Sequence, residues 1–435
     1  MTIEIKSAMG GLILSWMLAM PLAQAETVAY EEFKTLDQMR QVLSRENFDE
    51  ARPMLEKYLN HVDNPYSPAG ELSTCFFENL EIVKTLDRWV QEHPDDHMPY
   101  TLRGFYRFLL GMDARGGASV DKIPDEQWQA VGERFGLALE DIKHSLELKQ
   151  DQLLLYDSLL DIARIMSWDD AETRNILAAG LRYFPDSYML RATFIYGLTP
   201  RWGGSYEAMQ AFVDESRPAM ERNPAIRALE GASLLDQARV AWHAEEQDVA
   251  MNLLTRALEY GEDEDILSTR ADLYYIKQDY AHAIEDQTRV IALDPLKVSA
   301  YAWRAIALFK TGQTEAAMDD IRRSEHLQWN SWRLANAKGY ISEELMKVGK
   351  TQCDDKDYTA AEQTLSKAIE FNSENKKAYY WRARVYLFQN KLEQAQRDYQ
   401  EVLRIDPNHK EAAARWNEIY LRLQHEGAAS QAPAN

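Results

Sequence analysis

The sequence predicts an all-α fold: a right-handed α-solenoid of paired helices, preceded by a divergent helical-repeat domain. Three observations lead there. The composition is rich in helix-forming residues and poor in glycine (19) and proline (14), and runs of alternating β-branched residues are almost absent. The C-terminal half repeats with a period near 34 residues. A chain of 435 residues is also too long for one ordinary compact core.

The period can be counted from alanines that recur in the second helix of each predicted pair. They are Ala250, Ala283, Ala317, Ala361 and Ala395, separated by 33, 34, 44 and 34 residues. Arg-Ala pairs at 270/271, 304/305 and 382/383 report the same spacing, with ten extra residues before the last. We place this insertion at residues 331–341, where it would lengthen the first helix of the fourth repeat by nearly three turns.

This helix-turn-helix period resembles the tetratricopeptide repeat (TPR). Small residues at Ala271, Ala305, Gly349 and Ala383 let the helices of a pair approach closely, and Asp-Pro at 294/295 and 406/407 ends the second helix. We expect about five repeats, starting near residues 231, 264, 298, 342 and 376. The resemblance implies a concave groove lined by the first helices, a protein or peptide partner, and a scaffold function.

The N-terminal half reads as further amphipathic helices with short polar breaks. Its motifs resemble an uncharacterised bacterial family, a domain of unknown function marked by W-V-x(3)-P, R-G-x-Y, A-R-G and P-R-W-G-G-S-Y. They fall on Trp89–Pro94, Arg103–Tyr106, Ala114–Gly116 and Pro200–Tyr206. This resemblance implies a helical domain often joined to repeats, and no known reaction.

The N-terminus indicates export. Lys6, an apolar run over 8–22 and the small-x-small ending Ala23-Gln24-Ala25 form a signal-peptide pattern, so we expect cleavage after Ala25, a periplasmic protein and no stable membrane anchor afterwards. The predicted segments are a signal peptide (1–25), a divergent helical domain (26–228), the repeat array (229–409), a capping helix (410–424) and a disordered tail (425–435). Whether Cys75 and Cys353 pair is left open.

The charge and the motifs exclude several classes of function. A net charge of −21 disfavours nucleic acid, which needs clustered positive charge. No nucleophile elbow, phosphate loop or metal motif occurs, so we expect no catalytic residue, no metal and no cofactor. An enzyme remains the least favoured alternative.

Two candidate sites remain. The first is a protein-binding groove on the first helices of the repeats, where aromatic and arginine side chains are typical of binding hot spots. Its residues are Tyr275, Trp303, Phe309, Tyr380, Trp381 and Arg384. Packing between helices is the alternative role for each of them.

The second candidate is the loop at residues 199–209, where two glycines precede a predicted helix-capping serine. It is either a rigid corner or a site for an anionic small ligand or wall fragment. The residues of that site would be Arg103, Arg115, Arg201, Trp202, Gly203, Gly204 and Ser205.

Overall fold

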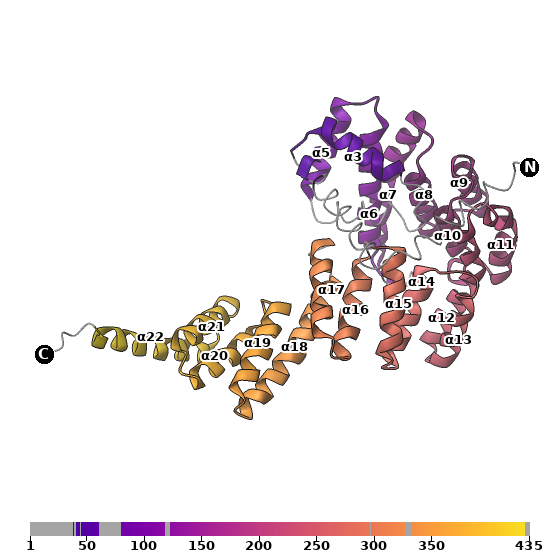
Figure 1. Ribbon diagram of the computed structural model, residues 1–435. Helices are drawn as coiled ribbons and strands as arrows, with labels where there is room; N and C mark the ends of the chain where they lie inside the picture. Colours follow the sequence, from indigo (N-terminus) through magenta and orange to yellow (C-terminus); the bar gives the residue numbers. More distant parts are fainter. Residues whose placement is uncertain are drawn as a thin grey trace, which may run out of the picture. The chain divides into compact units, whose positions relative to one another are not determined.

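The computed structural model (Figure 1) describes residues 38, 41–43, 45–60, 80–117, 122–295, 297–327 and 332–430. The predicted signal peptide, Cys75 and the last five residues of the chain lie outside this range. The described residues up to Lys297 form one compact unit, and those from Val298 onward form a second. No helix among the described residues is both long and apolar enough to cross a membrane.

The all-α prediction is confirmed, because the described residues contain helices and no strand. The helices of the first unit are α3 (Phe48–Asn60), α5 (Leu80–Glu92), α6 (His97–Arg115), α7 (Asp125–Leu148), α8 (Leu153–Ile165), α9 (Asp170–Tyr183), α10 (Tyr188–Gly197), α11 (Tyr206–Met220), α12 (Ala232–His243), α13 (Gln247–Ala257), α14 (Glu264–Ile276) and α15 (Tyr280–Leu293), with the 3-10 helices η2 (Pro200–Trp202) and η3 (Pro224–Gly231).

The second unit consists of successive helix pairs and a last single helix (Figure 1). Its helices are α16 (Val298–Lys310), α17 (Thr314–Leu327), α18 (Trp332–Asp354), α19 (Tyr358–Phe371), α20 (Lys376–Phe388), α21 (Leu392–Ile405) and α22 (Lys410–Ser430). Each first helix packs on the second helix of its own pair, and the first helices α16, α18 and α20 also pack on one another in order. This is the arrangement of an α-solenoid.

The first helix of the fourth pair is longer than its counterparts. Helix α18 has 23 residues, whereas α16 and α20 have 13 each. The ten additional residues are those that the counted spacing places near 331–341. The last helix, α22, continues to Ser430, beyond the predicted end of the capping helix at Gln424.

Within the pairs, alanines from both helices are fully buried, as their spacing predicts. Ala305 and Ala317 in one pair, and Ala383 and Ala395 in another, have no exposed surface. Small side chains at these positions let the helix axes come close, so the surrounding Leu, Val and Tyr side chains fill the space between neighbouring pairs.

Three pairs also contain a buried ion pair between their two helices. Arg304 of α16 donates from Nε and Nη2 to the carboxylate of Asp320 in α17, at 2.7 Å each. The same two-bond geometry joins α14 to α15 and α20 to α21, through Arg270–Asp286 and Arg382–Asp398. The arginine always precedes the aspartate by 16 residues. We call these three contacts the arginine–aspartate bridges.

Candidate functional site

One candidate site lies where the first helices α18 and α20 meet. The half-buried indole of Trp381 has the Lys350 ammonium 4.9 Å from its ring centroid and the Arg384 guanidinium 4.4 Å from it. Lys350 comes from α18, and the other two side chains from α20. We call these three residues the Trp381 surface. Cations over an indole face stabilise each other's position, so the three side chains form one preorganised cluster.

The two cations of the Trp381 surface differ in their charge partners. Lys350 is paired with Asp354, one turn further along α18, at 2.7 Å. No carboxylate among the described residues forms an ion pair with Arg384. In a chain with net charge −21, a half-buried guanidinium without a carboxylate partner is a point where a partner's negative charge is favoured.

The other predicted groove residues occupy varied positions. Tyr380 packs between helices, with its ring 5.4 Å from His409 and 5.9 Å from Tyr399. Burial, together with a hydrogen bond to Glu411, raises the pKa of Tyr380 to about 12. Its surroundings are those of a packing residue. The remaining three predicted residues are half-buried on first helices: Tyr275 on α14, and Trp303 and Phe309 on α16.

The second candidate site begins with the loop after α10, which is a tight corner. Ser205 accepts a hydrogen bond from the Ala208 N–H at 3.1 Å and caps α11, as predicted. Gly203 has φ +90°, a conformation that other residues rarely adopt. Gly204 is needed for a different reason from the predicted positive φ: a Cβ there would lie 2.1 Å from the Leu198 carbonyl oxygen.

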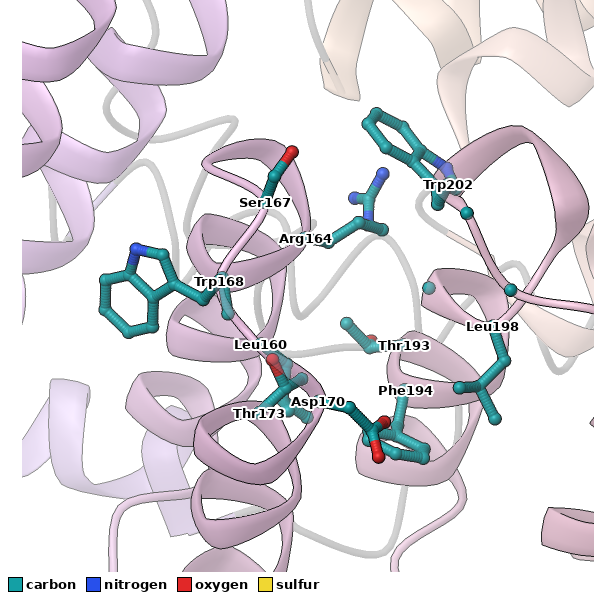
Figure 2. Close-up of a pocket in the computed structure, with 14 residues that line it drawn as sticks. Leu160, Arg164, Ser167, Trp168, Asp170, Thr173, Thr193, Phe194, Leu198 and Trp202 are labelled. Carbon is teal, nitrogen blue, oxygen red and sulfur yellow. The ribbon is translucent and has the colours of Figure 1, made fainter. Parts of the chain in front are cut away.

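The corner also forms one wall of a cavity of about 240 Å³, so the two predicted roles of the loop are not exclusive (Figure 2). The other walls come from α8, the start of α9, and α10. The lining residues are Leu160, Ala163, Arg164, Ser167, Trp168, Asp170, Thr173, Thr193, Phe194, Gly197, Leu198, Trp202, Gly203 and Gly204. Three of the predicted loop residues, from Trp202 to Gly204, are among them.

The cation at this cavity is Arg164, which the sequence did not single out. Its guanidinium lies 4.7 Å from the Trp202 ring centroid and 4.8 Å from that of Tyr196, and it is paired with Asp161. Only 11% of the Arg164 side chain is exposed. Figure 2 shows the guanidinium directed toward Trp202, above the side chains of Thr193 and Leu198.

The three arginines predicted to converge on the loop do not do so. Arg103 and Arg115 lie twelve residues apart on α6, which separates them by about 18 Å along the helix axis. Arg103 donates two hydrogen bonds to Asp141, at 2.7 and 2.9 Å, and Arg115 donates to the Gly116 carbonyl at 2.8 Å. Arg201 is turned toward Asp236, 3.6 Å away, and does not line the cavity.

Comparison with known proteins identifies the class of the repeats. Two parts of the chain, residues 268–331 and 354–415, match family models described as tetratricopeptide repeat. The chain therefore carries tetratricopeptide repeats, although the two matches together cover less than half of it. Such repeats imply a protein-interaction scaffold. No curated protein matches the sequence.

Solved TPR structures resemble the chain only distantly. YrrB, described as a TPR protein with an unusual peptide-binding site, is 16% identical, with TM-score 0.28, over 46% of this chain and 95% of its own. TTC0263 of Thermus thermophilus is 18% identical, with TM-score 0.24, over 44% and 99%. The TPR domain of P58(IPK) is 16% identical, with TM-score 0.27, over 85% and 98%. Because all three TM-scores are low, the fold assignment rests on the helix pairs and the two repeat matches.

Proposed function

We propose that this protein is an exported scaffold of the bacterial cell envelope that binds a protein or peptide partner on its tetratricopeptide repeats. The observation that carries the proposal is the Trp381 surface, a half-exposed indole fixed between two cations on the face of the first helices. Tryptophan and arginine are the residue types most enriched among binding hot spots. Export rests on the signal-peptide pattern of residues 1–25.

The chemistry of the Trp381 surface suggests what the partner presents. The indole offers an apolar face, and Arg384 offers a guanidinium that no carboxylate of the described chain neutralises. A segment with an apolar side chain next to a carboxylate would satisfy both. We therefore propose a partner peptide with an acidic group, no role for nucleic acid, and no catalysis or cofactor.

The test is site-specific photo-crosslinking in cells that produce the full-length protein. A photoreactive residue replaces Trp381 in one variant and Trp332 in a control. Trp332 is a matched control because it is also a tryptophan next to an arginine, with Arg333 4.7 Å from its ring, but it lies in the inserted part of α18 and is 62% exposed. Fractionation of the cells tests export in the same experiment.

The proposal expects one discrete crosslinked protein from position 381 and none of that mass from position 332. Arg384→Ala, combined with the probe at 381, should reduce the crosslink several-fold and remove its dependence on salt concentration. Equal labelling from both positions, or no discrete product from a folded protein, would rule out the Trp381 surface. Recovery of the uncleaved chain in the cytoplasm would rule out export.

A further inference from the structure

The cavity beside Trp202 has polar and apolar walls on different sides. Leu160, Phe194 and Leu198 supply apolar surface, and Ser167 and Thr173 supply hydroxyl groups. A cavity of about 150 Å³ holds a benzene ring, so 240 Å³ has room for a six-membered ring with several substituents. The size and the mixed lining are typical of a site for one small polar ring.

Two N–H donors at the cavity have no hydrogen-bond partner among the described residues. They are Nε of Arg164 and Nε1 of Trp202, both buried from water. A buried donor without an acceptor destabilises a protein by about 1–3 kcal/mol, so such groups are rare unless something else supplies the acceptor. A ligand oxygen at this end of the cavity would satisfy them.

The charges around the cavity argue against an anionic ligand. Arg164 is already paired with Asp161, and a second carboxylate, Asp157, lies on the same helix and accepts a hydrogen bond from Thr193 at 2.5 Å. Burial, followed by the charge of Asp161, raises the pKa of Asp157 to about 7. The one guanidinium therefore has too many carboxylates to neutralise rather than too few, and it has no positive charge to spare.

We propose that this cavity binds an uncharged sugar ring. The apolar wall would contact the C–H face of the ring, the two unpartnered N–H groups would donate to ring hydroxyl oxygens, and Asp170 at the rim would accept from a hydroxyl group. A sugar satisfies all three because its hydroxyl groups both donate and accept, and it brings no charge to a cluster that is already balanced. This site is separate from the repeats and independent of the proposed scaffold function.

The decisive variant is Gly197→Ala, which narrows the cavity without harming the fold. A Cβ at this position would lie 3.6 Å from Cδ of Arg164, an ordinary contact, and alanine favours the helix that Gly197 ends. Gly136→Ala is the matched control, because it is the same change in helix α7 with no atom within 4 Å of the new Cβ. Trp202→Phe keeps an aromatic ring and removes the Nε1 donor.

The full-length protein is titrated with glucose, N-acetylglucosamine and glucuronate in saturation-transfer NMR. The two neutral sugars should bind and glucuronate should bind more weakly. Gly197→Ala should weaken neutral-sugar binding by about tenfold or more, Trp202→Phe by several-fold, and Gly136→Ala not at all. Preference for glucuronate would overturn the neutral-ligand proposal in favour of an anion site. Absence of binding by both neutral sugars, or undiminished binding by Gly197→Ala, would overturn the site itself.

Discussion

The two kinds of buried arginine in this protein differ in how completely their partners match them. Arg304 of α16 is 5% exposed and makes two hydrogen bonds to one carboxylate, that of Asp320. Arg164 of α8 is 11% exposed, is paired with Asp161, and keeps an Nε without a partner. The first arginine joins two helices of a repeat, and the second lines a cavity.

The difference shows how structural and functional arginines can be told apart. A guanidinium whose donors meet a carboxylate in the two-bond geometry is fully used by the fold, and its position fixes one helix against another. A guanidinium with an unused donor beside an open space has bonding capacity left for a ligand. The same reasoning places Arg103 with the structural group, because Asp141 accepts two of its hydrogen bonds.

The largest effect is expected from breaking a matched arginine. Asp320→Asn would leave the buried charge of Arg304 without its counter-ion, which destabilises proteins by about 3–5 kcal/mol. The free energy of unfolding, measured by urea denaturation, should fall by this amount. Asp319→Asn is the control: its carboxylate is 59% exposed and 3.5 Å from Arg322, so a change of at most about 0.5 kcal/mol is expected. Equal effects of the two variants would show that the bridge does not stabilise the pair.

The pair without a bridge, α18 and α19, should instead depend on close packing. Val348 and Thr364 stand where other pairs have arginine and aspartate, and a Cβ on Gly349 would lie 2.6 Å from Cγ of Leu365. Gly349→Ala should therefore lower the free energy of unfolding by about 1–3 kcal/mol. Gly339→Ala in the same helix meets no atom within 4 Å and should raise it by up to about 1 kcal/mol. A stabilising Gly349→Ala would contradict the close approach.

The sequence predicted the repeats well because a repeat is a pattern along the chain. Alanine spacing alone indicated the helix pairs and the extra length of α18. The arginine–aspartate bridges could have been found in the same way, since an aspartate follows each arginine of the Arg-Ala pairs by 16 residues, and the fourth repeat lacks both residues together.

The cavity could be predicted only in part, because its walls come from segments that fold together without a shared pattern. The loop motif indicated Trp202 and its glycines, which do line the cavity. The cation came from Arg164, in an otherwise ordinary amphipathic helix, and not from the arginines within the motifs. Periodicity indicates which face of a helix is buried, but not which charged residue meets a loop about forty residues later.

The surplus carboxylate near Arg164 gives a pH-dependent prediction. Asp157 ionises near pH 4 in the unfolded chain but, with its pKa raised to about 7, keeps its proton in the folded protein until neutral pH. Because the folded state binds more protons between these values, the free energy of unfolding falls as pH rises through this window. Asp157→Asn should remove this decline and stabilise the protein by about 1–2 kcal/mol above pH 7, with no gain near pH 4.

The control for this prediction is Asp170→Asn, since Asp170 lies at the cavity rim with 68% of its side chain exposed and is paired with Arg174 at 3.0 Å. Its removal should leave the slope of stability against pH unchanged between about pH 4 and pH 7. Urea denaturation of the three proteins at a series of pH values measures both slopes. If Asp157→Asn keeps the wild-type slope, the carboxyl of Asp157 is ionised across the range, and the argument that Arg164 has no spare charge fails.

The smallest effect should come from building a bridge where the fourth pair lacks one. Val348→Arg with Thr364→Asp restores the spacing of 16 residues seen in the three bridged pairs. Val348 is 49% exposed, so the new ion pair would be solvated and worth about 0–1 kcal/mol, far less than the buried bridge at Arg304. A double-mutant cycle isolates this coupling from the effects of the single substitutions. A coupling as large as that between Arg304 and Asp320 would mean that two-bond geometry, and not burial, gives the bridges their strength.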